Sequence, residues 1–196
     1  MVPYNIPLSD IRQLNPAGII LSGGPANVTM EQAPGCDSGL FKLGVPVLGV
    51  CYGMQLMAVQ HGGQVSKAPK GEYGLSRVQL DTNASLFSGL KAESDTWMSH
   101  SYQVSTLPDG FVSTASTATC PIAAMEAPAL GLYGVQFHPE VTHSQQGMEI
   151  IRRFALDICR ATADWRMDSF AQQAIEDIRK VVGQGTVLLG LSGGVD

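Results

Sequence analysis

The sequence is poor in charged residues and has no concentration of positive charge. Only 15% of its 196 residues are charged, and 12 Lys and Arg against 17 Asp and Glu give a formal net charge of -5. A nucleic-acid surface requires a basic patch, so this composition argues against one. No apolar run approaches a membrane span or a secretory signal. With 44% hydrophobic residues, the chain can bury the core of one domain with an appendage.

Cysteine and histidine are also few and scattered. The four cysteines contain no Cys-x-x-Cys pair and lie at Cys36, Cys51, Cys120 and Cys159. This spacing indicates neither a zinc site nor a disulfide framework, so we expect no bound metal. An exposed reactive thiol in such a chain would belong in a reducing cytoplasm.

The most informative stretch, residues 46–57, is an apolar run interrupted by a cysteine between two glycines. A short buried strand ends at Gly49 and a helical pattern begins at Met54, which places Cys51 on a sharp corner. Hydrolases expose nucleophiles on such strand-to-helix corners, and the amides of the following helix would stabilise a thiolate there. Gln55, one turn later, would share this face. A small buried thiol with no chemistry is the alternative.

A second stretch, residues 132–140, is an alternating apolar strand that ends in His138, Pro139 and Glu140. A thiol nucleophile needs a nearby base and a group that orients this base. His138 and Glu140 supply both roles. A strand-end histidine without chemistry is the alternative, but its combination with the cysteine corner is much more specific than either half.

Residues 49–55 (GVCYGMQ) and 136–140 (QFHPE) together resemble a class I (triad) glutamine amidotransferase domain. Residues 22–25 (SGGP) and 141–144 (VTHS) narrow the resemblance to the GMP synthase family. The resemblance implies an α/β fold with an open, mostly parallel, flavodoxin-like sheet flanked by helices. It also implies hydrolysis of glutamine without a cofactor, through the triad Cys51, His138 and Glu140.

The segment SGGP follows residues 17–21, which we predict to form a buried parallel strand. A glycine pair at the carboxyl end of a strand lets main-chain N–H groups point into a cavity. By the resemblance, the N–H groups of Gly24 and Tyr52 would hold the oxyanion of the tetrahedral intermediate. An ordinary Gly-Pro turn is the alternative.

Residues 97–104 (WMSHSYQV) depart from the family pattern Trp-Met-Ser-His-Gly-Asp-x-Val, because Ser101 and Tyr102 replace Gly and Asp. By the resemblance, main-chain groups of this segment grip the α-amino and α-carboxyl groups of glutamine. The expected substrate contacts are therefore Ser99, Ser101 and Tyr102, together with Gln55. The serine restricts the backbone angles, and Tyr102 removes a carboxylate that could meet the substrate ammonium. We expect His100 to be structural.

The remaining elements are predicted from periodicity and turn residues. Residues 8–14 predict a short helix, and residues 71–74 (GEYG) predict a turn between strands. Further strands are predicted at residues 76–80, 111–115 and 122–125. Residues 147–158 predict a helix that packs on the sheet through a stripe formed by Ile151, Phe154, Ala155 and Ile158.

The organisation changes after residue 160, which divides the chain into an amidotransferase domain over 1–160, a linker and helix over 161–184, and residues 185–196. An amphipathic helix is predicted at 169–182 and a strand at 186–191. The last five residues resemble the pyrophosphate loop of N-type ATP pyrophosphatases, whose amides cradle pyrophosphate. They are Ser192, Gly193, Gly194, Val195 and Asp196.

We therefore expect a chain that is truncated at both ends. The family's first strand unit, with its Gly-Ser-Gln turn, is missing, and residues 185–196 would begin a synthetase domain. By the resemblance, that domain would use ATP and Mg to aminate XMP to GMP and would mediate a homodimer. The alternatives are an amidotransferase subunit of anthranilate or carbamoyl phosphate synthase, which leaves residues 192–196 unexplained, and a non-catalytic fragment.

Overall fold

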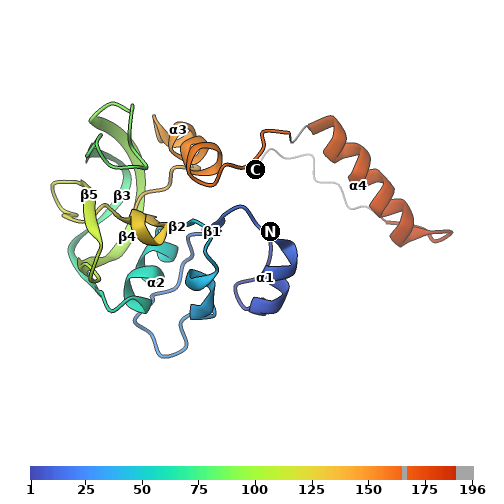
Figure 1. The fold of residues 1–196 in the computed structure, drawn as a ribbon, viewed down its shortest axis with the longest axis horizontal. Helices are drawn as coiled ribbons and strands as arrows, with labels where there is room; N and C mark the ends of the chain where they lie inside the picture. Colours follow the sequence, from blue (N-terminus) through green and yellow to red (C-terminus); the bar gives the residue numbers. More distant parts are fainter. Residues whose placement is uncertain (165–166, 189–196) are drawn as a thin grey trace. The chain divides into compact units, whose positions relative to one another are not determined.

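The computed structural model of the chain describes residues 1–164 and 167–188. The chain forms two compact units, Met1–Ala161 and Thr162–Asp196 (Figure 1). The predicted pyrophosphate loop, residues 192–196, lies outside the described residues. In the described part of the chain, no helix combines the length and the apolar character needed to cross a bilayer.

The first unit is built on one seven-stranded sheet in the order β1-β2-β7-β6-β5-β3-β4. Its strands are β1 (Ile19–Leu21), β2 (Val47–Val50), β3 (Gln64–Leu80), β4 (Glu93–Thr106), β5 (Val112–Ser116), β6 (Ala124–Ala127) and β7 (Leu132–Val135). The first three strands in this order are parallel, and the other four pair antiparallel. The α/β class is confirmed, but the sheet is mixed rather than mostly parallel, because β5, β6 and β7 follow one another through short connections that only antiparallel strands allow.

Helices cover both faces of this sheet. They are α1 (Leu8–Leu14), η1 (Ser38–Lys42), α2 (Tyr52–Gln60), η2 (Pro128–Leu130), α3 (Gly147–Arg152) and the π-helical turn η3 (Arg153–Ile158). In Figure 1, α2 and α3 lie on opposite sides of β1 and β2. Alternate residues of β2 accordingly enter two cores, since Leu48 packs in the cluster that contains Ile150 and Val47 in the cluster that contains Met57.

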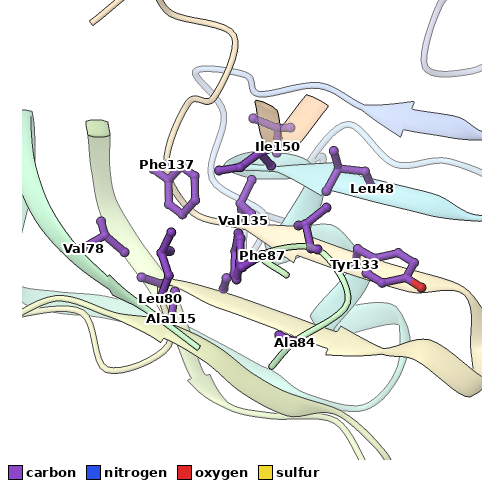
Figure 2. Packing of buried hydrophobic residues seen from close by; sticks show 14 of the residues in the cluster. Leu48, Val78, Leu80, Ala84, Phe87, Ala115, Tyr133, Val135, Phe137 and Ile150 are labelled. Carbon is purple, nitrogen blue, oxygen red and sulfur yellow. The ribbon is translucent and has the colours of Figure 1, made fainter. Parts of the chain in front are cut away.

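The core on the α3 side is formed by aromatic and aliphatic side chains from distant parts of the chain. Figure 2 shows Phe137 and Ile150 beside Val135 and Phe87, and all four are almost completely buried. The predicted stripe on residues 147–158 is only partly right, because Ile150 is fully buried whereas Ile151 is half-buried. The wider π-helical turn that follows α3 changes the angle between successive side chains, so α-helical spacing does not hold across residues 147–158.

Two predictions about strands are wrong. The parallel strand at β1 is present, but it is not buried, and Ile20 is 51% exposed because β1 lies at the edge of the sheet. The predicted turn at residues 71–74 is part of β3, where Glu72 pairs with His100 and Gly74 with Met98. Gly71 instead lies in a register shift between Lys67 and Glu72, an irregularity that a long antiparallel pair absorbs.

The second unit contains α4 (Met167–Val182), which agrees with the helix predicted at residues 169–182. Residues 186–188, the described part of the strand predicted at 186–191, have no strand structure. A strand is stabilised by ladder hydrogen bonds to a neighbour, and none is described for these residues.

The helix α2 lies very near to β1 at Gly53, which yields a stability prediction. A Cβ atom on Gly53 would lie 2.2 Å from the carbonyl oxygen of Leu21, whereas one on Gly35 would meet nothing within 4 Å. We expect Gly53→Ala to lower the free energy of unfolding by about 2 kcal/mol, since backbone must move to admit the methyl group. Gly35→Ala is the matched control and should change it by less than about 0.5 kcal/mol. Urea denaturation measures both, and equal midpoints would contradict this account.

Candidate active site

Cys51 occupies the predicted corner between β2 and α2. Its backbone has φ 51° and ψ -104°, a conformation that residues with a side chain rarely adopt. Its N–H donates to the carbonyl oxygen of Val135 at 2.8 Å. A Cβ on Gly49 would lie 2.5 Å from the nitrogen of Met54, so only glycine allows the helix to start this close to the strand. Cys51 therefore precedes the first turn of α2, where the amide of Tyr52 has no intrahelical partner.

His138 follows β7 in the chain, and backbone contacts with β4 hold it in place. Its N–H donates to the carbonyl oxygen of Trp97 at 2.9 Å, forming an isolated bridge. The Ser144 hydroxyl donates to the carbonyl oxygen of His138 at 2.6 Å and accepts from the N–H of Trp97 at 3.0 Å. The serine of the VTHS motif therefore has a structural role, because this buried side chain joins the segment that carries His138 to β4.

The side chains of Cys51, His138 and Glu140 form a chain of contacts. His138 Nδ1 lies 2.8 Å from Glu140 Oε1, which leaves Nε2 as the ring nitrogen for the sulfur. A hydrogen bond with Cys51 is the main reason that the pKa of His138 rises to about 9, and Glu140 adds to it while burial opposes it. Gly23 lies against both partners, since a Cβ there would be 3.0 Å from His138 Cε1 and 3.6 Å from Cys51 Cβ.

Cys51 and His138 open into a cavity of about 490 Å³ at the carboxyl ends of β1 and β2. It is lined by Gly24, Pro25, Ala26, Asn27, Cys51, Tyr52, Gln55, Tyr73, Ser99, His100, Ser101, Tyr102 and His138. The residues predicted to hold the oxyanion and the substrate therefore all face one cavity. Glu140 does not line it and lies behind the imidazole.

The sulfur of Cys51 also contacts Ser99, which the sequence predicted as a substrate contact, and Gln136, which the sequence did not single out. It lies 3.8 Å from the carbonyl oxygen of Ser99 and 3.5 Å from Nε2 of Gln136. Gln136 is completely buried, and its Oε1 accepts from Gln55 Nε2 at 3.1 Å. The sequence did contain a signal for Gln136, because it is a polar residue between Val135 and Phe137 in an apolar segment. A polar side chain buried in such a segment needs hydrogen-bond partners.

His100 lines the cavity, but its ring is engaged elsewhere. Nδ1 lies 3.1 Å from the carbonyl oxygen of Tyr102, and Nε2 lies 3.1 Å from Glu72 Oε2. The other carboxylate oxygen of Glu72 accepts from Thr117 at 2.7 Å and from Thr119 at 2.9 Å. This arrangement fixes the wall that carries Tyr102.

The thiol of Cys120 completes a buried group with Glu72 and His100, whose potential metal-ligand atoms lie within 4.8 Å of one another. Both oxygens of Glu72 and both ring nitrogens of His100 already have hydrogen-bond partners. Cys120 Sγ donates to the carbonyl oxygen of Ile122 at 3.5 Å. The group is therefore satisfied as a hydrogen-bonded cluster.

The other thiols differ from Cys51 in their surroundings. Burial raises the pKa of Cys120 to about 12, with the Glu72 carboxylate adding to it, and raises the pKa of Cys159 to about 11. The pKa of Cys36 is raised as well, mainly by burial. All four cysteines are free thiols. Burial therefore favours the protonated, unreactive form of Cys36, Cys120 and Cys159, whereas the sulfur of Cys51 contacts an imidazole.

The comparison with known families agrees with this geometry. The family described as "Glutamine amidotransferase class-I" matches residues 1–158. The chain therefore belongs to the class I glutamine amidotransferase family.

Its relatives within this family include curated proteins named GMP synthase [glutamine-hydrolyzing]. The protein from Acetivibrio thermocellus is 50% identical over 196 residues, which is all of this chain and 38% of the relative. The protein from Syntrophomonas wolfei is 51% identical, with the same coverage of both chains. This chain thus spans 38% of the length of these relatives.

Solved structures show the same fold. A protein from Thermoplasma acidophilum, assigned as part of a GMP synthase, aligns with a TM-score of 0.73 and 31% identity, over 90% of this chain and 83% of that one. A glutamine amidotransferase from Thermotoga maritima aligns with a TM-score of 0.58 over 90% of this chain and 75% of that one. At 19% identity, the second similarity concerns the fold alone.

The contact between Cys51 and His138 predicts how the imidazole titrates. We expect an NMR-detected pKa of about 9 for His138. Cys51→Ala should lower it most, because the hydrogen bond with the sulfur is the largest cause, and Glu140→Gln should lower it less. Because the folded-state pKa is raised, the contribution to stability is complete below about pH 6.5 and is lost as the pH rises through about 9. A pKa near 9 that persists in Cys51→Ala would contradict the contact.

The buried Glu72 cluster predicts a stability loss. Glu72→Leu would leave His100 and two threonines without their acceptor, so we expect the free energy of unfolding to fall by about 3–5 kcal/mol. Glu72→Gln keeps the shape and part of the bonding and should cost less. Glu31→Leu, at an exposed position, is the control and should change stability by less than about 0.5 kcal/mol. Denaturant unfolding measures the stability of the three variants. If Glu72→Leu and Glu31→Leu lowered the free energy of unfolding equally, the structural role of Glu72 would be rejected.

Proposed function

We propose that this chain hydrolyses glutamine to glutamate and ammonia through Cys51, His138 and Glu140. The observation that carries the proposal is the hydrogen bond between the sulfur and the imidazole, formed at a helix N-terminus inside a cavity. A thiolate paired with an imidazolium is an activated nucleophile, and a carboxylate that orients the base completes the arrangement. In this role Cys51 attacks the side-chain amide carbon of bound glutamine.

The following steps use groups that already surround the sulfur. The carbonyl oxygen becomes negative as the C–S bond forms, and the N–H groups of Gly24 and Tyr52 would stabilise it. Each such donor contributes about 3 kcal/mol in enzymes studied by mutation. His138 gives its proton to the departing nitrogen, the C–N bond breaks, and ammonia leaves while the acyl group stays on the sulfur as a thioester. His138 then takes a proton from water, whose oxygen attacks the thioester and releases glutamate and the thiolate.

Recognition of the substrate is proposed for Gln55 and residues 99–102. Ser99, Ser101 and Tyr102 line the same cavity as Cys51, and the carbonyl oxygen of Tyr102 is held by Gln55 at 2.8 Å and by His100 at 3.1 Å. Main-chain groups of a segment held this firmly can meet the α-amino and α-carboxyl groups of glutamine. Ser99 and Tyr102 pair with β3, which fixes their main-chain groups, whereas Ser101 lies at the register shift between the two strands.

The names of the relatives support a further proposal about the whole enzyme. Ammonia made here would aminate XMP to GMP in a synthetase domain of the full protein. That domain would use ATP and Mg, its pyrophosphate loop would include residues 192–196, and it would carry the contacts of a homodimer. A cytoplasmic location fits this chemistry, since reducing conditions keep Cys51 as a free thiol.

Covalent labelling tests the glutaminase proposal. A diazoketone analogue of L-glutamine should alkylate Cys51 with loss of nitrogen gas, and excess glutamine should prevent the reaction. His138→Asn should slow labelling by about 100-fold or more, because it removes the base. Peptide mass spectrometry locates the adduct, and release of glutamate measures turnover.

Two variants serve as controls for this experiment. Cys159→Ser removes a thiol outside the cavity and should leave the labelling rate unchanged, whereas Cys51→Ser should abolish labelling. An adduct spread over all four cysteines, or none on Cys51, would reject the proposal and favour the non-catalytic alternative.

A further inference from the structure

We infer that Gln136 is a positioning residue that donates a hydrogen bond to the Cys51 sulfur and favours its thiolate form. This inference rests on the proposed role of Cys51 as nucleophile. It concerns a side chain that lies outside the triad and outside the cavity lining. Gln136 is completely buried, so its amide must find partners in the protein.

The contacts around Gln136 determine which end of its amide faces the sulfur. The carbonyl oxygen of Tyr102 can only accept, so the Gln55 atom 2.8 Å away from it must be the amide nitrogen. The same nitrogen lies 3.1 Å from the terminal atom of Gln136 that must therefore be the oxygen. The remaining terminal atom of Gln136, 3.5 Å from Cys51 Sγ, is consequently the NH2 group. The orientation thus follows from an acceptor that cannot be reversed.

The two other neighbours of the sulfur act in opposite directions. The carbonyl oxygen of Ser99, 3.8 Å away, can accept a hydrogen bond from the thiol but repels a thiolate. His138 favours the thiolate as an imidazolium. The N–H of Gln136 bonds more strongly to a charged acceptor than to a neutral thiol, so it adds to the effect of His138. Because the amide is held by Gln55 from α2, it also limits where the sulfur can move.

Other titratable groups face this region and share in any measured pH dependence. His138 is backed by Glu140, and His100 on β4 is backed by Glu72 on β3. Tyr52, Tyr73 and Tyr102 line the same cavity. When a thiol and an imidazole share a hydrogen bond, the midpoint of a pH profile reports on both groups. A Gln136 variant must therefore be compared with the parent chain under identical conditions.

The pH profile of Cys51 alkylation by iodoacetamide, followed by peptide mass spectrometry, tests the inference. Gln136→Met keeps the approximate size but removes the donor, and it should raise the midpoint by about one pH unit, so that alkylation at lower pH is about tenfold slower. Gln136→Glu keeps an oxygen for Gln55 and places an acceptor beside the sulfur, so it should raise the midpoint further. The rate on the high-pH plateau should stay the same, which shows that the site is intact.

Gln103→Met is the matched control, because it makes the same substitution at another buried glutamine. Gln103 lies in β4, and its Oε1 has no hydrogen-bond partner in the described part of the chain. The midpoint of this variant should equal that of the parent. In the parent chain, the side-chain amide protons of Gln136 should shift with the Cys51 titration by NMR, and Cys51→Ser should abolish this shift. An unchanged midpoint in the folded Gln136 variants, or an amide that does not respond in the parent chain, would overturn the inference.

The experiment separates this inference from the glutaminase proposal. Alkylation by iodoacetamide needs no glutamine, so a shifted midpoint in a chain that the glutamine analogue does not label would reject the proposed function alone. Normal labelling by the analogue with an unshifted midpoint would reject the role of Gln136 alone.

Discussion

The site depends on the close approach of α2 to β1 and β2. At Gly53 and Gly49 the helix lies so near to the strands that a single methyl group would overlap backbone atoms at 2.2 and 2.5 Å. The chain can make this approach only by turning sharply at Cys51, whose φ of 51° is costly for a residue with a side chain. The turn leaves the sulfur in the cavity beside the first amides of α2. Packing of the two cores, one on each side of the sheet, offsets the energetic cost of this local strain.

The two parts of the mixed sheet contribute different halves of the site. The parallel part, β1, β2 and β7, carries the corner and delivers the strand that leads to His138. The long antiparallel pair of β3 and β4 supplies the opposite wall, and its register places Glu72 against His100. The two halves belong to one continuous sheet, and a backbone bridge between Trp97 and His138 links them directly beside the site. The distance between nucleophile and base therefore depends on the sheet as a whole.

Environment rather than residue type distinguishes the proposed nucleophile from the other thiols. Burial raises the pKa of Cys120 to about 12, and it has a carboxylate near it. Cys51 is also largely buried, but it meets an imidazole, a helix N-terminus and the amide of Gln136. The proposed reaction needs one reactive thiol only, and these surroundings would make the reactivity of Cys51 specific.

Local patterns in the sequence were enough to predict the corner at Cys51 and the pairing of His138 with Glu140, because strand periodicity, flanking glycines and a two-residue spacing are short-range features. Predictions that treated segments in isolation were wrong for the burial of β1 and the turn at residues 71–74, since a strand's exposure and continuity depend on its neighbours. Only the tertiary structure placed Gln136 against a sulfur 85 residues away and Ser144 against a strand 47 residues away. A hydrogen bond between distant residues leaves no periodic signal, because its geometry exists only after the sheet has brought both partners together.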